Sequence, residues 1–297
     1  MTCSTRRDFL QQSIALGAAA MAAGPLGRSL AMAADKPGSK MKLGLVTYLW
    51  GQDWDLPALI ANCEKSQVLG VETRTTHRHG VEPSLNAERR KEVKSRFDDS
   101  PVVFVGPGSN ERFDDPDPQK LEAAIEATKA FVKLSHDCGG SGVKVKPNSF
   151  HKNVPREKTI EQIGKSLNTV GNFAGDLGQE IRLEVHGSCC ELPTIKAIMD
   201  VADDPNVGVC WNSNSQDLAG KGLEYNFNLV QDRFGDTAHV RELNIGKYPY
   251  QELIGLFVKM DYDGWILLEC RTRPKDRIAA LNQQREVFQE MVAKAQG

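Results

Sequence analysis

The chain has 297 residues, of which 26% are charged and 40% are hydrophobic, and its formal net charge is −2. This is the balance of an ordinary globular protein, so the composition excludes a disordered or collagen-like chain. The slight acidity argues against a nucleic-acid partner, since such binders usually carry a basic excess. The sequence contains no uninterrupted apolar run of about 18 residues, the length needed to span a membrane permanently.

The first 33 residues have the pattern of a bacterial export signal. Arg6 and Arg7 precede a Phe-Leu step, an Ala-rich apolar run covers residues 14–23, and a small-residue cleavage site ends at Ala33. This arrangement is typical of the twin-arginine route. We therefore expect residues 1–33 to be a cleavable signal peptide and the protein to be periplasmic or otherwise extracytoplasmic. The alternative is a cytosolic protein with a basic, Ala-rich amphipathic start.

Residues 34–41 are expected to be a short polar linker, and from residue 42 onward short apolar strands alternate with longer helical stretches. The predicted strands cover residues 43–49, 71–75, 102–105, 142–146, 181–185, 207–211, 238–243 and 265–270. The predicted helices cover residues 57–69, 87–97, 117–136, 156–177, 193–201, 225–233, 250–260 and 275–295. Residues 106–108, Gly-Pro-Gly, indicate a loop after the third strand.

This alternation predicts an α/β fold in which residues 42–297 form a single (β/α)8 TIM barrel. Strands separated by helices pair in parallel, and eight such units close a barrel. The alternative is a doubly wound open sheet, which would need a Gly-rich turn after the first strand to hold a dinucleotide phosphate. That turn instead contains Trp50, Gly51 and Trp54. We therefore expect the barrel and no nucleotide cofactor.

Six cysteines follow the expected signal peptide, and they are Cys63, Cys138, Cys189, Cys190, Cys210 and Cys270. None forms a Cys-x-x-Cys motif, and several lie in apolar, strand-like runs. Such cysteines are more often buried free thiols than members of a disulfide framework. We therefore expect free thiols, although the count is even and the expected location is oxidising.

In barrels of this class the chemistry lies at the C-terminal ends of the strands. Glu184 and His186 end the fifth strand two residues apart, so their side chains point to the same side. They are a candidate acid–base or ligand pair, the alternative being a salt-bridged polar stripe that includes Arg182. Glu269 ends an otherwise apolar eighth strand, where a buried carboxylate needs a partner or a cation.

The alternative to a functional role is that a salt bridge to Arg271 or Arg273 compensates the charge of Glu269. Further polar side chains end neighbouring strands, among them Lys146, Asn212, Asn214, His239 and Arg241. Together these groups suit a polyhydroxylated or carbonyl-bearing small molecule. His77 and His79 have a spacing at which two histidines could bind a metal ion, but we expect histidines at this spacing in a loop to be solvated or hydrogen-bonded.

The sequence resembles the sugar phosphate isomerase/epimerase superfamily, the xylose-isomerase-like barrels. The matching segments are residues 42–47, 70–72, 183–186, 207–212, 239–241 and 263–269. The resemblance extends over nearly all of the chain after residue 41. It is more specific for the fold than for the reaction.

The resemblance implies a divalent cation (Mn, Mg, Co or Zn) bound by a Glu on strand five, an Asp on strand six, a His on strand seven and a Glu on strand eight. Glu184 and Glu269 match the two glutamates, which in the family also move protons beside the sugar carbonyl. The other two positions depart from the pattern, since Asn212 replaces the Asp and Arg241 is interpreted as occupying the His position. An amide brings no charge and a guanidinium cannot ligate, so the cation site is expected to be weakened.

His239, two residues before Arg241, or His186 could supply the missing imidazole, and the spacing does not decide between them. The resulting hypothesis assigns catalysis to Glu184 and Glu269. Cation binding is assigned to Glu184, Asn212, His239 and Glu269. Substrate binding is assigned to His186, Lys146, Asn214 and Arg241.

Three classes of function remain open at this point. The first is an exported sugar or keto-sugar isomerase or epimerase that abstracts a proton next to a carbonyl. The second is a lyase or hydrolase that uses the same proton abstraction on an oxidised glycoside. The third is a non-catalytic sugar-binding barrel with a degraded metal site. In all three classes we expect the protein to bind a small carbohydrate, and each class is compatible with a homodimer.

Overall fold

The structure, a computed structural model, describes residues 36–297, so the expected signal peptide lies outside the described residues. Within residues 36–297, no helix has the length and apolarity needed to cross a membrane. The segment before the first strand packs closely, because the Gly38 N–H donates to Asp261 Oδ1 at 2.7 Å and Gln296 donates to the Pro37 carbonyl at 2.9 Å.

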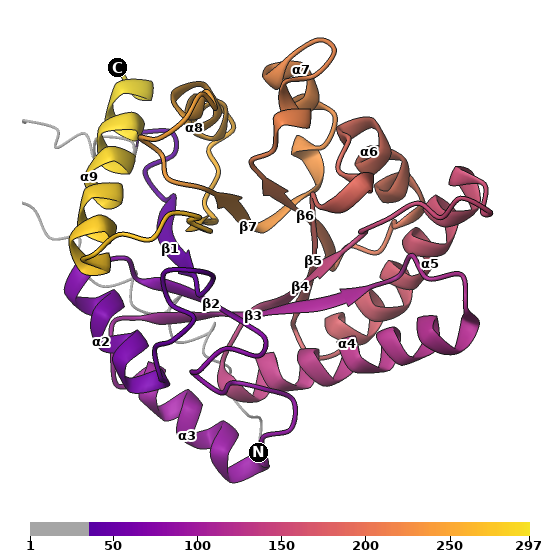
Figure 1. Cartoon of the computed structure of the whole chain (residues 1–297), viewed down its shortest axis with the longest axis horizontal. Coiled ribbons are helices and arrows are strands. Elements are labelled where there is room, and N and C mark those ends of the chain that lie inside the picture. The colour runs from indigo at the N-terminus through magenta and orange to yellow at the C-terminus, as the bar shows by residue number, and fades with distance from the viewer. Residues whose placement is uncertain (1–35) are drawn as a thin grey trace, which may run out of the picture. The chain divides into compact units, whose positions relative to one another are not determined.

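Eight parallel strands, paired in chain order, form a closed barrel in which β1 also pairs with β8 (Figure 1). The strands are β1 (Lys42–Val46), β2 (Gly70–Arg74), β3 (Val103–Arg112), β4 (Gly142–Lys146), β5 (Glu180–Glu184), β6 (Val207–Asn212), β7 (Phe234–Val240) and β8 (Trp265–Leu268). A helix follows each strand, as the alternation in the sequence predicted. The predicted (β/α)8 TIM barrel is therefore confirmed.

The helices form a ring outside the strands (Figure 1). They are α2 (Leu56–Ser66), α3 (Ala87–Asp98), α4 (Pro118–Cys138), α5 (Arg156–Gly175), α6 (Leu192–Val201), α7 (Leu223–Asn228), α8 (Tyr250–Lys259) and α9 (Arg277–Ala295). Side chains cap the N-termini of several of these helices. Asp55 and Asp117 each accept a hydrogen bond from a main-chain N–H in the first turn, and a proline follows at the first or second helical position.

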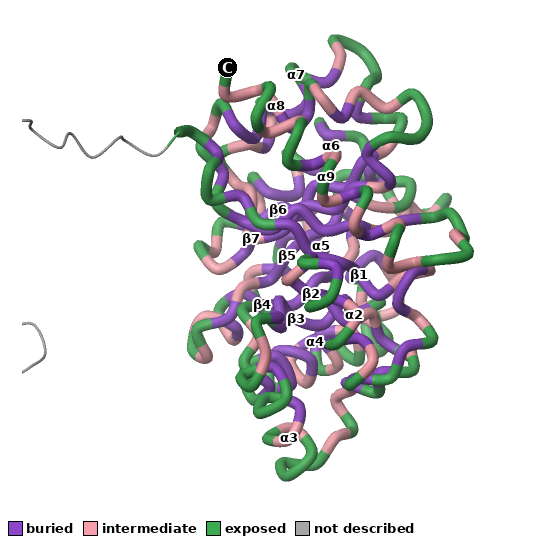
Figure 2. The backbone as a smooth tube through the Cα atoms, turned by 90° about the vertical axis from the view of Figure 1, so that its left-hand side faces the viewer, coloured by how far each residue is buried: buried purple, intermediate pink, exposed green. Residues whose placement is uncertain are grey.

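The barrel has two apolar regions, separated by the strands. The large core lies between the strands and the helices, and Figure 2 shows burial concentrated at the strands, with the exposed residues in the surrounding helices and loops. A smaller cluster contains Val46, Val105, Trp265 and Leu267. These residues alternate with helix-facing positions along their strands, so they fill the barrel interior. The six cysteines of residues 36–297 are buried and free, as predicted.

Glycine at position 70 makes room for Trp265 inside the barrel. A Cβ at Gly70 would lie 2.3 Å from the indole ring. We expect Gly70→Ala to lower the free energy of unfolding by about 1–3 kcal/mol, because overpacking forces the ring or the strand to move. Urea unfolding measures this. Gly255→Ala on α8 is the control, since a Cβ there meets nothing within 4 Å; an equal loss in the control would contradict the packing argument.

Several elements differ from the sequence prediction. β3 continues through residues 106–108, which had indicated a loop, because a register shift against β2 absorbs an extra residue. Gly106 has φ +145, and a Cβ there would lie 2.0 Å from the Gly142 carbonyl oxygen, so only glycine fits. The predicted helix 225–233 covers only Leu223–Asn228, because a separate 3₁₀ turn takes up Gln231–Arg233. The seventh strand, predicted at residues 238–243, instead runs from Phe234 to Val240, and the Phe234 ring packs edge-on against Phe227.

Candidate active site

A network of charged side chains lies inside the barrel, towards the C-terminal ends of the strands. Glu72 on β2, Lys144 on β4, Glu184 on β5 and His239 on β7 are each 2% exposed or less. Charged groups are rarely buried this completely unless they are paired or hold an ion. Their contacts therefore show what this end of the barrel can do.

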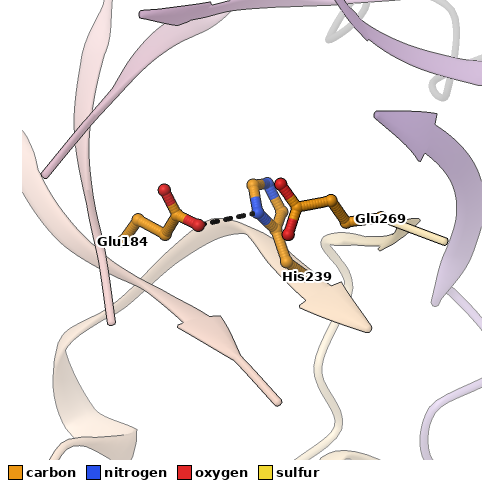
Figure 3. A group of neighbouring side chains, drawn as sticks. All are labelled: Glu184, His239 and Glu269. Atoms are coloured by element: carbon orange, nitrogen blue, oxygen red, sulfur yellow. Dashed lines mark ion pairs between the residues drawn. The ribbon is translucent and has the colours of Figure 1, made fainter. Parts of the chain in front are cut away.

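Glu184, His239 and Glu269 converge at the centre of this network (Figure 3). Glu184 is the last residue of β5, His239 is the penultimate residue of β7, and Glu269 directly follows β8. One ligand atom from each residue lies within 4.8 Å of the others. In Figure 3 the three side chains point toward one another, and a dashed line joins Glu184 to the imidazole. This is an arrangement that one cation could bridge.

Two groups fix the Glu184 carboxylate. The Lys144 ammonium lies 3.0 Å from Glu184 Oε2, and Asn212 Nδ2 donates to Glu184 Oε1 at 2.8 Å. The alternative in which salt bridges join Arg182, Glu184 and His186 is wrong, because Arg182 pairs instead with Glu180 at 2.7 Å and Asp236 at 3.6 Å. Glu184 therefore belongs to the site and Arg182 does not.

His239 takes the imidazole position that the sequence left open. Its Nε2 lies 3.2 Å from Glu72 Oε2, and its Nδ1 lies 3.6 Å from Glu184 Oε1. The interpretation that Arg241 occupies this position is wrong, because the His239 imidazole itself lies between Glu184 and Glu269. Arg241 lies beyond the end of β7, where its main-chain N–H donates to Tyr250 Oη at 3.0 Å.

The residues present fit a divalent cation. Asn212 Oδ1 and His239 Nδ1 are buried and have no hydrogen-bond partner among the residues described. Both are acceptor atoms next to two carboxylates, and a donor set of carboxylate, amide oxygen and imidazole suits Mg²⁺, Mn²⁺, Co²⁺ or Zn²⁺. Within residues 36–297 no ion pair joins Glu269 to Arg271 or Arg273, so that alternative does not satisfy its charge.

The two carboxylates have unequal environments. Burial would raise the pKa of Glu184, but the nearby Lys144 ammonium and His239 outweigh it and hold that pKa well below its ordinary value. For Glu269, burial and then the charge of Glu184 raise the pKa. Two carboxyl groups whose pKa values are pushed apart can take different roles in a proton transfer.

Two of the predicted substrate-binding residues border an open cavity. Lys146 and His186 lie two residues beyond Lys144 and Glu184, and both line a cavity of about 750 Å³ against the outer half of β3 and the start of α4. Lys146 Nζ donates to Asn110 Oδ1 at 3.1 Å, and His186 Nδ1 has no hydrogen-bond partner within residues 36–297. Both therefore remain available to a ligand at the barrel mouth.

Other predicted residues serve the scaffold. Both amide hydrogens of Asn214 are used, since Nδ2 donates to the Val185 carbonyl at 2.9 Å and the Asn212 carbonyl at 2.8 Å. Asn214 thus ties the end of β5 to the end of β6 and does not reach into the site. His77 and His79 are hydrogen-bonded, as predicted; for instance, His79 Nε2 lies 3.0 Å from the Arg74 carbonyl.

The sequence reasoning missed Glu72 and Lys144 as parts of the site. Each interrupts a short apolar strand, at the inward-facing positions of residues 70–74 and 142–146. The signal was available, because Lys144 is two residues before the predicted site residue Lys146 and therefore shares its side of the strand. Nothing in the sequence indicated that Glu72 pairs with His239 or Lys144 with Glu184, because these residues lie far apart along the chain.

Comparison with known proteins identifies the family. The model of the xylose isomerase-like TIM barrel family matches residues 60–291, and the sequence matches no curated protein. Among solved structures, 3-keto-D-glucoside 4-epimerase (YcjR) from E. coli is 13% identical with a TM-score of 0.71, covering 84% of this chain and 99% of that one. An L-ribulose 3-epimerase is 14% identical with a TM-score of 0.74, covering 86% and 95%.

A third structure is that of the IolI protein with a binding zinc atom. It is 15% identical, has a TM-score of 0.72, and the match covers 86% of this chain and 99% of that one. At such identities these similarities show the fold alone. The family model, by contrast, matches well over half of the sequence. This chain belongs to the xylose isomerase-like TIM barrel family.

Proposed function

We propose that the protein is a sugar or keto-sugar isomerase or epimerase that transfers a proton next to a carbonyl between Glu184 and Glu269. The observation that carries the proposal is the convergence of these two carboxylates on His239, at the C-terminal end of a closed barrel. Supporting it, two of the structures with the same fold are described as sugar epimerases and one contains a zinc atom.

Glu184, Asn212, His239 and Glu269 would hold a divalent cation. When bound, the cation supplies electrostatic stabilisation of the negative charge that develops as the proton leaves carbon. Lys144 keeps Glu184 ionised, so Glu184 is the better proton acceptor. Glu269, whose pKa is raised in the absence of a cation, is the proton donor to the opposite face or the adjacent carbon, and proton exchange with solvent then restores both carboxyl groups.

Lys146 and His186 would orient the sugar. Both border the cavity of about 750 Å³, which has the volume of an ordinary small-molecule site. An ammonium and an imidazole can donate hydrogen bonds to hydroxyl or carbonyl oxygens. The reacting carbon would lie at Glu184 and Glu269, and the remainder of the molecule would extend past Lys146 into the cavity.

The proposal is tested by proton exchange in D₂O. The protein, supplied with Mn²⁺, is incubated with a panel of neutral ketoses and keto-glucosides, and products are followed by ¹H NMR and mass spectrometry. We expect an isomer of the substrate that carries deuterium next to the carbonyl. A product that has lost or gained a fragment would favour the lyase or hydrolase alternative. Binding without any exchange would favour the sugar-binding alternative.

Lys146 gives the reaction a pH dependence. Burial, followed by the charge of Lys144, lowers the pKa of Lys146 to about 8. The ammonium form therefore predominates below that pH and is lost as the pH rises through it, so we expect KM for the sugar to rise above about pH 8. Lys146→Arg should move this loss to higher pH, because a guanidinium stays protonated. A KM that is flat with pH in the native enzyme would contradict this role.

We also propose that the protein acts outside the cytoplasm, on the strength of the export pattern in residues 1–33. Replacing Arg6 and Arg7 by lysine should leave the precursor in the cytoplasm and prevent cleavage after Ala33. Cell fractionation with immunoblotting measures this. Mature protein in the periplasm of the double variant would contradict the proposed route.

A further inference from the structure

Glu72 is a buried carboxylate for which the proposed proton transfer has no use. It lies on β2, is 1% exposed, and is 167 residues away from His239 in sequence. A carboxylate buried this deeply is costly unless a specific partner stabilises it. Its Oε2 lies 3.2 Å from His239 Nε2, which is itself fully buried. The pair is therefore a specific arrangement of the barrel interior.

This contact orients the imidazole. A neutral imidazole has one N–H donor and one acceptor nitrogen, and a carboxylate can only accept. If Nε2–H is directed at Glu72, the nitrogen left to bind a cation, once its proton is lost, is Nδ1, which faces Glu184 Oε1 at 3.6 Å. Nδ1 has no hydrogen-bond partner in the described part of the chain. Nδ1 thus faces the position that Glu184 and Glu269 share.

The main chain is shaped to admit Glu72. A Cβ at Gly108 on β3 would lie 2.5 Å from Glu72 Oε1. Any larger residue at position 108 would push the carboxylate away from its place. Gly108 pairs with Arg74 in the β2–β3 register, just after the shift that lengthens β3. The glycine and the glutamate are therefore matched across neighbouring strands.

We propose that Glu72 is a positioning residue that fixes the orientation and tautomer of His239, so that Nδ1 binds the cation held with Glu184 and Glu269. Metal-ligating histidines commonly donate their other N–H to such a carboxylate, which also raises the basicity of the ligating nitrogen. The inference rests on the cation site of the proposed function and on no particular substrate. It also gives Gly108 a role, which is to leave space for the Glu72 carboxylate.

The test is cation binding by the whole mature chain, without substrate. Mn²⁺ affinity is measured by isothermal titration calorimetry, and the Co²⁺ absorption spectrum reports the ligand geometry. We expect Glu72→Leu and Gly108→Ala each to weaken binding, with about a 10- to 100-fold loss for Glu72→Leu and an altered Co²⁺ spectrum. Glu72→Gln keeps an acceptor oxygen and should retain more of the affinity. If Glu72→Leu fails to fold, Glu72→Gln and Gly108→Ala decide the question.

Glu180→Gln is the matched control, because Glu180 also comes from a barrel strand but pairs with Arg182 away from the cation ligands. It should bind Mn²⁺ as the native chain does. In the Zn²⁺-loaded protein, ¹⁵N shifts should show His239 protonated at Nε2. Native-like affinity in all the Glu72 and Gly108 variants, or a proton on Nδ1, would overturn this inference alone. No cation binding by the native chain would overturn the cation site of the proposed function as well.

Discussion

Replacing either Glu184 or Glu269 by glutamine is expected to lower turnover of a true sugar substrate by about 10²- to 10⁴-fold, the usual contribution of a positioned acid or base. Glutamine has nearly the same shape, so the barrel should stay intact while the proton acceptor or donor is lost. The measurement is the initial rate of deuterium incorporation next to the carbonyl. Metal content is measured in parallel, because both residues are also proposed ligands.

The control for this pair is Glu191→Gln. Glu191 lies just before α6, its side chain is 63% exposed, and it makes only a 3.7 Å ion pair with Arg156. This variant should turn over sugar at the native rate. If Glu184→Gln and Glu269→Gln retained native turnover on a confirmed substrate, the proton-transfer assignment would be wrong.

Replacing Lys144 by methionine is expected to lower the free energy of unfolding of the metal-free protein by about 3–5 kcal/mol. The reason is that Glu184 would remain buried without its nearest cation, since the Lys144 ammonium lies 3.0 Å from it and both side chains are 2% exposed. Urea unfolding in the presence of a chelator measures the effect. Adding Glu184→Gln should recover about 0.5–3 kcal/mol, the range of coupling found between contacting residues.

The matched control is an exposed ion pair of similar length. Lys165 on α5 lies 2.7 Å from Glu161, and the two side chains are 69% and 41% exposed. Lys165→Met should change stability by less than about 1 kcal/mol, because water screens the charges. A loss at Lys144 no larger than that at Lys165 would show that Glu184 does not depend on its buried cation.

The Lys144 prediction and the proposed role of Glu72 concern one charge arrangement. Lys144 holds Glu184 ionised from one side, and Glu72 holds the imidazole of His239 from the other. Neither needs to touch a substrate. Both would set where the proton acceptor and the cation ligand point, and small errors in such positions are costly in catalysis.

The sequence by itself determined the fold and the two central carboxylates. Eight alternations of strand and helix admit few parallel architectures, and the C-terminal strand ends are where a barrel exposes functional groups. Glu269 stood out because it ends an apolar strand, where an acid has no local reason to lie, and Glu184 because it ends a strand two residues before His186, on the same side. These are local signals, and they do not depend on knowing which strands are neighbours.

Only the tertiary structure showed which side chains of the site contact one another. His239 and Arg241 are two residues apart and would share a side if β7 ran on, but β7 ends at Val240, so His239 joins the cluster and Arg241 lies beyond the strand. Glu72 meets His239 across 167 residues. Such contacts depend on strand register and barrel closure, which place distant inward-facing residues at one level, and a periodic pattern in the sequence fixes neither.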